Sequence, residues 1–172
     1  MIFPPFTNLI TDRLILRELQ ASDAEQIFKI RTDARVNEFL DRAPTKSIDE
    51  SLKFINNILK AQSKEEGMMW AITLKNDPEL IGTVVYWHIE KEKDKAEIGY
   101  EMLPEYCGQG IMREALTEVI RFGFETMLLK TIVAETKADN LRSVNALQKC
   151  GFEEIGKADD GYLIYQRRDL RF

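Results

Sequence analysis

The chain has 172 residues, of which 44% are hydrophobic, and this length predicts one domain, residues 1–172, with a sizeable core. Its formal net charge of -5 argues against a nucleic-acid-binding protein, because phosphate binding needs a clustered basic face. The two cysteines, Cys107 and Cys150, have neither the spacing nor the histidine neighbours of a zinc site, so we expect no metal.

The first ten residues, "MIFPPFTNLI", contain two prolines and no basic residue, so no secretory signal is expected. No apolar run reaches the length of a membrane span. Free thiols suit a reducing compartment, and the sequence therefore predicts a cytoplasmic protein that binds no membrane.

The N-terminal third predicts one strand followed by two helices. The segment Arg13–Leu19, "RLILREL", has the pattern of a first strand. Capping-box patterns, Ser22 with Glu25 and Ser47 with Glu50, each predict a helix start. The second of these helices carries one apolar stripe, made of Leu52, Ile55, Ile58 and Leu59.

An antiparallel meander follows from Met68. The segments 68–75 and 80–89 are rich in aromatic and β-branched residues and flank "NDPE", which predicts a hairpin. The run from Glu90 to Glu97 alternates in sign and predicts a solvated hairpin end. The segment 96–103, "AEIGYEML", predicts a third strand, with one face formed by Ala96, Ile98, Tyr100 and Met102.

The C-terminal part alternates helices and strands. The segment "GIMREAL" opens a helix with a predicted buried face of Met112, Ala115, Leu116, Val119, Ile120, Gly123 and Met127, while Glu114 and its neighbours face away. Residues 131–137 predict a short buried strand, and residues 139–150 a helix that ends at Gly151. Residues 152–168 predict a final hairpin. The order of elements predicts an α+β fold with a mixed sheet.

The glycines Gly108 and Gly110 precede the first of these C-terminal helices. They do not form a P-loop, because neither Lys-Ser nor Lys-Thr follows them. They do not form a dinucleotide fingerprint either, because Arg113 occupies its sixth position and no βαβ unit surrounds it. Two hypotheses remain: the helix N-terminus binds a pyrophosphate through its N–H groups, or the glycines only relieve strain in a turn.

Three segments, "TDRLILREL…DA", "AEIGYEMLPEYCGQGIMREAL" and "DNLRSVNALQKCGF", resemble the Gcn5-related N-acetyltransferases (GNAT) in order and spacing. Within that superfamily the chain is similar to the RimJ/RimL-like branch of ribosomal-protein-alanine N-acetyltransferases, from about Leu9 to the final hairpin. The resemblance implies a single-domain GNAT fold, with a mixed, mostly antiparallel twisted sheet flanked by about four helices. It also implies acetyl-CoA as the acetyl donor.

The resemblance further implies which residues bind coenzyme A. Pantetheine is expected along the backbone of Tyr100, Glu101 and Met102. The pyrophosphate is expected at the N–H groups of the glycine segment, through Gly108, Gln109, Gly110, Ile111, Met112 and Arg113. Two residues depart from the family's pattern, since Cys107 replaces Arg or Gln and Met112 replaces a small residue. Because the expected contacts come mainly from the backbone, neither change abolishes the site, although Met112 is expected to narrow it.

Acetyl transfer to an amine needs a base for the acceptor and a proton donor for the departing thiolate. The resemblance implies Glu97 and Glu135 as the candidate bases, with a chain of waters as the alternative. Each could instead be a strand glutamate that faces solvent or pairs with a lysine, as Glu135 would with Lys137. Glu101 is a weaker candidate, placed for surface charge or attraction of the substrate.

The residues Asn140 and Ser143 begin the penultimate helix, where by themselves they indicate a helix cap and a first-turn polar residue. The resemblance implies that Asn140 binds coenzyme A and that Ser143 lies near its sulfur. Many relatives place an acid tyrosine further along this helix, where this chain has Leu147. Ser143, or a water that it holds, is therefore the candidate that protonates the thiolate.

Other reactive side chains are expected to have structural roles. A covalent mechanism through Cys107 is disfavoured, because the one histidine, His88, lies on a different predicted strand. His88 is expected to be a strand residue with a satisfied hydrogen bond. The aromatic residues of the meander are expected to pack within the sheet, namely Trp70, Trp87, Tyr86 and Tyr100.

The leading hypothesis is an N-acetyltransferase in which a primary amine attacks acetyl-CoA directly in a ternary complex. The expected acceptor is a protein or peptide N-terminal α-amine. The alternatives are a small-molecule amine, such as an antibiotic, polyamine or metabolite, and a non-catalytic module that binds coenzyme A, which Cys107 and Met112 keep open. The resemblance implies that residues 21–63 and 159–167 set specificity. A homodimer is a hypothesis that no sequence feature tests.

Overall fold

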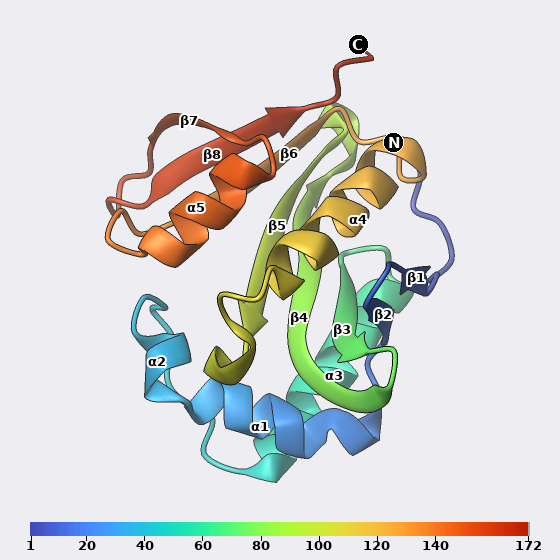
Figure 1. The fold of residues 1–172 in the computed structure, drawn as a ribbon. Helices are drawn as coiled ribbons and strands as arrows, with labels where there is room; N and C mark the ends of the chain where they lie inside the picture. The colour runs from blue at the N-terminus through green and yellow to red at the C-terminus, as the bar shows by residue number, and fades with distance from the viewer. Residues whose placement is uncertain (172) are drawn as a thin grey trace.

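Eight strands form one sheet in the described residues, 1–171, of this computed structural model, and Phe172, the last residue of the predicted domain, lies outside them. The strands are β1 (Leu9–Ile10), β2 (Leu14–Glu18), β3 (Met68–Leu74), β4 (Asp77–Glu90), β5 (Lys95–Met102), β6 (Thr131–Thr136), β7 (Glu153–Lys157) and β8 (Leu163–Arg168). They pair in the order β1-β2-β3-β4-β5-β6-β8-β7 (Figure 1). All neighbours are antiparallel except β5 and β6, which confirms the predicted mixed, mostly antiparallel sheet.

Helices cover both faces of the sheet. Within residues 1–171 they are α1 (Ala24–Thr32), α2 (Ala34–Asn37), α3 (Ile48–Ser63), α4 (Ile111–Glu125) and α5 (Leu141–Lys149). In Figure 1, α4 and α5 lie on the near face, and the core on the opposite face packs against α1 and α3. The four-residue α2 adds a short element to the predicted helices, because so short a segment carries no readable period.

One predicted helix cap is confirmed and the other is wrong. The Glu50 N–H donates to Ser47 Oγ at 3.2 Å, as the pattern predicted. Ser22, by contrast, lies inside a 3₁₀ turn, Ala21–Asp23, that precedes α1. The Gln20 N–H donates to the carboxylate of Asp23 at 2.7 Å, and Arg17 forms an ion pair with this buried carboxylate at 2.7 Å. The buried charge of Asp23, satisfied from two sides, therefore fixes the start of the helical segment.

The predicted hairpin is present with a shorter turn than "NDPE". The turn is Lys75–Asn76, and β4 begins at Asp77 because the register shifts between Ile72 and Leu74. Pro78 lies within β4 but beyond the end of its pairing with β5, so its missing N–H leaves no ladder bond unmade. The charged run that follows β4 forms a short turn into β5, as predicted.

The buried face of α4 is nearly the predicted one. Its members that are buried as expected are Ala115, Leu116, Val119, Ile120 and Gly123. Met112 is only half-buried, and Ile111, at the first helical position, is buried in its place. Met127 is buried but lies beyond the end of the helix at Glu125.

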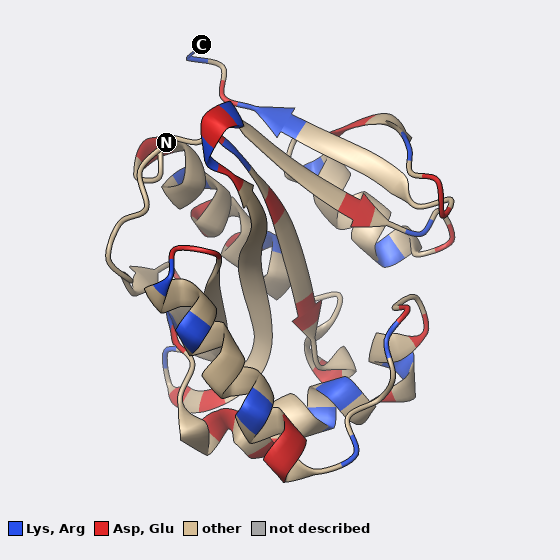
Figure 2. Cartoon of the chain, turned by 180° about the vertical axis from the view of Figure 1, so that it is seen from behind, with Lys and Arg blue, Asp and Glu red and all other residues tan. Residues whose placement is uncertain are grey.

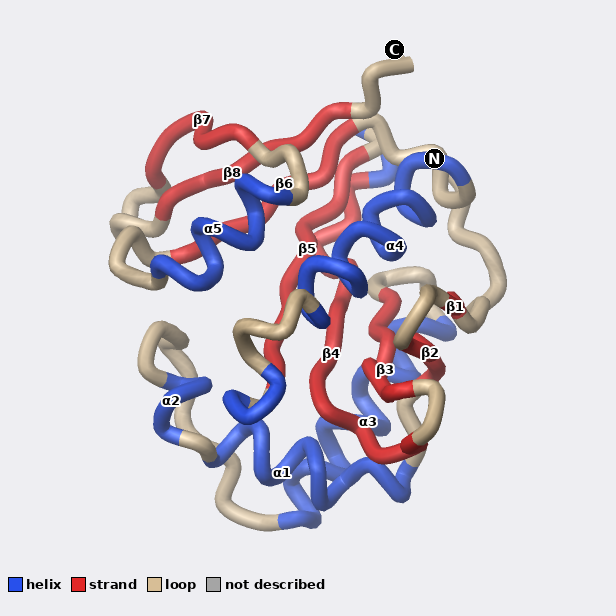
Figure 3. The backbone as a smooth tube through the Cα atoms, in the orientation of Figure 1, coloured by secondary structure: helices blue, strands red, loops and turns tan. Residues whose placement is uncertain are grey.

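The two parallel strands part after a very short contact. β5 and β6 pair only from Lys95 to Glu97 and from Thr131 to Val133. Figure 3 shows the two strands adjoining near one end and separated at the other. On its other side, β6 pairs with β8 along its whole length. Among the described residues, the end of β5, from Ile98 to Met102, therefore has strand partners only in β4.

Charged residues of both signs are spread over the helices and turns (Figure 2). No helix within residues 1–171 combines the length and the apolar composition that a membrane span requires.

Candidate active site

A cleft of about 570 Å³ is lined by the end of β5, the glycine loop and the first turns of α4 and α5. It contains most of the residues that the sequence predicted for coenzyme A, namely Tyr100, Glu101, Met102, Gly108, Gly110, Ile111, Met112, Arg113, Asn140 and Ser143. Gln109 is the exception, since its side chain donates instead to the carbonyl oxygen of Glu105 at 3.0 Å. Segments more than forty residues apart in the sequence thus meet at one cleft.

The glycine loop has the backbone of an anion-binding turn. Gly108 and Gly110 have φ values of 78° and 75°, in the left-handed region that side chains disfavour. Gly110 is the N-cap of α4, and its carbonyl oxygen accepts from the Glu114 N–H at 3.0 Å. The N–H groups of the first helical turn have no partner within the helix, and the helix dipole favours negative charge beside them. These features fit a phosphate group.

The residue Cys107 lines the same cleft, and its sulfur lies 3.9 Å from the carbonyl oxygen of Leu103. His88 is elsewhere, hydrogen-bonded to Glu97. Within residues 1–171, no basic side chain forms a hydrogen bond with Cys107.

A tyrosine and a serine meet across the cleft. The phenol oxygen of Tyr100, on β5, lies 2.7 Å from Ser143 Oγ and 3.3 Å from the Ser143 carbonyl oxygen, on α5. Tyr100 also packs against the core of the sheet, as expected, so its hydrogen bond with Ser143 is an addition to that packing. Burial raises the pKa of Tyr100 well above its usual value, and the hydrogen bond with Ser143 opposes this only in part, so the phenol keeps its proton.

The start of α5 is held as the sequence predicted. Asn140 Oδ1 accepts from the Ser143 N–H at 3.2 Å, which confirms the helix cap. Gly151 has a φ of 77° just past the helix end, as expected of a C-terminal stop. Leu147 is fully buried.

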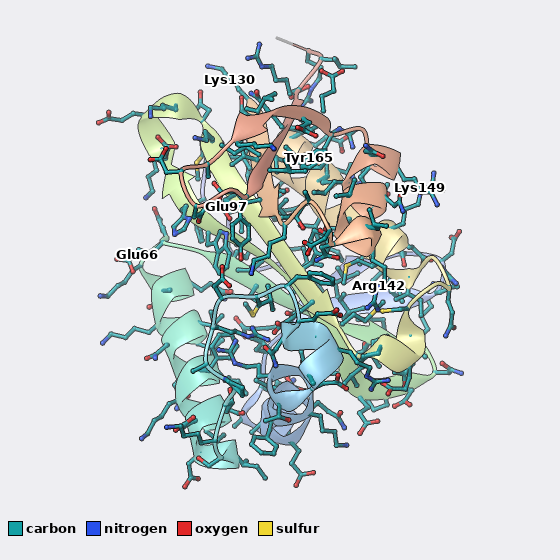
Figure 4. All side chains as sticks on the ribbon, turned by 90° about the vertical axis from the view of Figure 1, so that its left-hand side faces the viewer. Glu66, Glu97, Lys130, Arg142, Lys149 and Tyr165 are labelled. Carbon is teal, nitrogen blue, oxygen red and sulfur yellow. The ribbon has the colours of Figure 1, made fainter. Side chains whose placement is uncertain are left out.

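The two predicted bases lie on the other face of the sheet from α4. Glu97 on β5 pairs in register with Val133 on β6, and Glu135 is two residues further along β6 on the same face. Neither glutamate lines the cleft. Figure 4 shows Glu97 on β5 well apart from Arg142 and Lys149, which line the cleft from α5.

These glutamates differ in their partners. Glu97 Oε2 lies 2.7 Å from His88 Nδ1, and only 15% of the Glu97 side chain is exposed. Burial raises the pKa of Glu135, and the negative charges of Glu97 and Asp160 raise it further. In residues 1–171 no side chain donates a hydrogen bond to Glu135. Lys137 binds Asp41 at 2.7 Å, so it does not neutralise Glu135. The side chain of Glu135 is exposed, in agreement with the alternative in which this glutamate faces solvent.

His88 has the hydrogen bond that we expected, but its backbone has an unexpected positive φ. His88 has a φ of 43° at an irregularity in the pairing of β4 with β5, and it stacks on Trp87. Trp87 remains 43% exposed, so it packs less fully than predicted, whereas Trp70 and Tyr86 are fully buried as expected. This face thus presents an exposed aromatic ring beside Glu97.

The sequence missed the wall that faces β5. Residues after α1 line the cleft, namely Arg35, Val36, Phe39 and Leu40. Arg42 forms an ion pair with Glu101 at 2.7 Å, so the Glu101 carboxylate is neutralised and is a poor candidate for a base. Without a readable helix in this segment, no pattern in the sequence indicated these contacts.

A second polar cluster joins the two segments that were expected to set specificity. Tyr162, in the turn before β8, donates to Asp41 at 2.7 Å, and Lys137 binds the other oxygen of the same carboxylate. The cluster therefore ties the segment after α2 to the C-terminal hairpin. Within residues 1–171, no group of three or more His, Cys, Asp or Glu side chains is placed to hold a metal ion.

A family model described as an acetyltransferase (GNAT) domain matches residues 13–153. The N-acetyltransferase YoaA of Bacillus subtilis is 33% identical over 151 residues, covering 88% of this chain and 85% of that protein. The ribosomal protein uS5-alanine N-acetyltransferase of Escherichia coli is 30% identical over 172 residues, covering 93% and 85%. The spermidine N(1)-acetyltransferase of Vibrio cholerae is 24% identical over 158 residues, covering 92% and 89%.

Solved structures agree with this fold. The structure of RimL, a ribosomal L7/L12 α-N-protein acetyltransferase, has a TM-score of 0.84 at 20% identity, covering 94% of this chain and 93% of that one. The microcin C7 self-immunity acetyltransferase MccE, in complex with acetyl-CoA and AMP, has a TM-score of 0.80 at 22% identity, covering 92% and 94%.

Proposed function

Because this chain belongs to the GNAT family of acetyltransferases, we propose that it acetylates the N-terminal α-amine of a protein or peptide. It is an N-acetyltransferase, and its acetyl donor is acetyl-CoA. The observation that supports acetyl transfer at this site is the parting of β5 and β6, beside which a cleft lies between an unpaired strand edge, a glycine loop and a serine at a helix start, whereas the choice of acceptor rests on the relatives.

Residues of this chain fit each part of coenzyme A. The free backbone groups of Tyr100 to Met102 can bond the pantetheine amides as a further strand would. The glycine loop and the first turn of α4 can bind the pyrophosphate through N–H groups. Acetyl-CoA supplies the acetyl group as an activated thioester. The side chains of Arg113, Arg142 and Lys149 add positive charge along the cleft.

We assign the role of base to Glu135, with Glu97 as its electrostatic support. Glu135 lies on β6 just beyond the point at which the strands part, and its carboxylate is free of side-chain donors in residues 1–171. The charge of Glu97 raises the pKa of Glu135, which makes its carboxylate a better proton acceptor for an ammonium group. Glu97 itself is engaged by His88.

We assign the role of proton donor to Ser143. Its hydroxyl lines the cleft and is held at 2.7 Å by the phenol of Tyr100. When Tyr100 donates to Ser143 Oγ, the serine proton is free to be donated to the thiolate. Tyr100 thus orients the Ser143 hydroxyl that protonates the leaving thiolate.

The acceptor class is proposed from the relatives. The relative that acts on the alanine of ribosomal protein uS5 is 30% identical, whereas the relative that acts on spermidine is 24% identical. This difference favours an N-terminal α-amine. A small amine is the second candidate, because the acidic face around Glu97 and Glu135 suits any cation.

A thiol-release assay with acetyl-CoA tests the function. The acceptor panel consists of peptides with different N-terminal residues, the same peptides blocked at the α-amine, and polyamines. We expect thiol release with peptides that have a free α-amine and none with peptides that are blocked at the α-amine. Release with polyamines alone would establish the second candidate instead. Tight coenzyme A binding without release on any amine would indicate a non-catalytic binding module.

A further inference from the structure

The segment "TDRL" brings an arginine against the glycine loop, although Arg13 and Gln109 are 96 residues apart. Arg13 Nη1 donates to the carbonyl oxygen of Gln109 at 2.9 Å. Arg13 Nε donates to Glu114 Oε2, in the first turn of α4, at 2.6 Å. The guanidinium therefore clamps the loop and the helix start at the same time.

The clamp is itself held in place. The other oxygen of Glu114 accepts from the Arg13 backbone N–H at 2.8 Å and from Thr11 Oγ1 at 2.5 Å. Burial raises the pKa of Glu114, but the hydrogen bonds from Thr11 and Arg13 outweigh burial and keep the pKa below its usual value. Glu114 does not simply face away from the core, as its place in the helical pattern predicted, but binds the turn between β1 and β2.

The contact with Gln109 determines where the next N–H points. A trans peptide is planar, so its carbonyl oxygen and the following N–H point in opposite directions. The Gln109 carbonyl points to Arg13, which does not line the cleft, whereas Gly110 does line it. Anchoring this oxygen therefore turns the Gly110 N–H away from Arg13. Gly108 and Gly110 lack side chains that would restrict rotation of the peptide groups between them. The hydrogen bond from Arg13 therefore matters more here than it would in a loop without glycines.

We propose that Arg13 is a positioning residue for coenzyme A, which keeps the Gly110 N–H directed at the pyrophosphate by holding the Gln109 carbonyl. If this peptide turned over, a carbonyl oxygen would face the phosphate and repel it. The inference rests on the proposed function of the glycine loop. Arg13 does not line the cleft, and it acts through the loop.

The test compares a ligand that contains the pyrophosphate with one that lacks it. Binding of coenzyme A is measured by calorimetry, and binding of S-acetylpantetheine by NMR titration, for the parent protein, Arg13→Ala and Arg13→Lys. In both variants we expect the coenzyme A Kd to rise, by about tenfold in Arg13→Ala, because a hydrogen bond from a charged donor is lost. The S-acetylpantetheine Kd should stay within about twofold. A lysine lacks the fork that serves two acceptors, so Arg13→Lys carries the test if Arg13→Ala does not fold.

The matched control is Arg121→Ala, which removes an arginine that binds Glu118 and Glu125 on the outer side of α4. It should leave both Kd values unchanged. An unchanged coenzyme A Kd in the Arg13 variants, or an equal loss for both ligands, would overturn the inference. If the parent protein binds coenzyme A no better than S-acetylpantetheine, the proposed pyrophosphate site is wrong and the role of Arg13 falls with it.

Discussion

The phenol oxygen of Tyr100 lies 2.7 Å from the hydroxyl oxygen of Ser143, so this contact joins a strand and a helix that both line the cleft. Tyr100 keeps its proton, because burial raises the pKa of its phenol. This pair gives the serine a fixed orientation that its place at a helix start does not provide.

The pair can be tested by a double-mutant cycle. Ser143→Ala should lower kcat by about a hundredfold, because the proton donor is lost. Tyr100→Phe should lower kcat by about tenfold with little change in the KM of acetyl-CoA. In the Ser143→Ala background, Tyr100→Phe should have no further effect on kcat. Additive losses would mean that Tyr100 acts independently of Ser143.

The roles of Glu135 and Glu97 lead to a prediction about pH. Glu135 must be ionised to accept a proton, so kcat/KM falls as the pH drops through its pKa. Burial and the charge of Glu97 raise that pKa, so the acid limb should lie above the ordinary glutamate value of about 4.3. Glu135→Gln should abolish this limb and most of the activity. Glu97→Gln removes one of the causes and should move the limb to lower pH.

The control for the pH profile is Glu118→Gln on α4, a carboxylate that binds Arg121 on the same helix. Its acid limb should match that of the parent protein. If Glu135→Gln keeps the parent profile, the base is another group or a chain of waters.

The glycine loop predicts a defect in coenzyme A binding that backbone strain elsewhere in the chain does not produce. Gly110→Ala places a side chain at a φ of 75°, which costs about 1–2 kcal/mol in the conformation that directs the loop. The coenzyme A Kd should rise by about tenfold or more. Gly161→Ala imposes the same kind of strain at a φ of 87° in the turn before β8 and should leave the Kd unchanged. Equal affinities of the two variants would contradict a specific role for Gly110.

A different glycine predicts a loss of stability alone. A Cβ at Gly123 would overlap the hydroxyl of Tyr86, which donates to the Val119 carbonyl oxygen at 3.0 Å. Gly123→Ala should therefore lower the free energy of unfolding by about 1–3 kcal/mol in urea titrations. The cost of this change should shrink in a Tyr86→Phe background, where the displaced oxygen is absent. An undiminished cost would show that the overlap is not its cause.

Most of the fold could be predicted from the sequence, because its long elements carry clear periods. The alternation of β5 and the apolar stripe of α4 each follow from burying one face, so local patterns were sufficient. The two-residue β1 and the four-residue α2 are shorter than any period, and they were missed. The wrong cap at Ser22 had a tertiary cause, since the buried carboxylate of Asp23 is satisfied by Arg17.

The candidate site was predictable only where its residues form a local motif. The glycine loop and the Asn140 cap are each formed by a short continuous segment, and the resemblance to a known family placed the two segments at one site. The contacts of Tyr100 with Ser143 and of Arg13 with Gln109 join residues 43 and 96 positions apart. No local pattern specifies such pairs, because they depend on how the sheet opens.

The short pairing of β5 with β6 has a consequence for the protein before its donor binds. An unpaired strand edge is a surface on which any extended chain can add, including a segment of a neighbouring molecule. The edge from Ile98 to Met102, where we propose that the cosubstrate adds to the sheet, is therefore also open to faulty pairing with another chain. In the proposed binding mode a bound donor occupies the backbone groups that an intruding strand would need, so acetyl-CoA should slow aggregation of the protein.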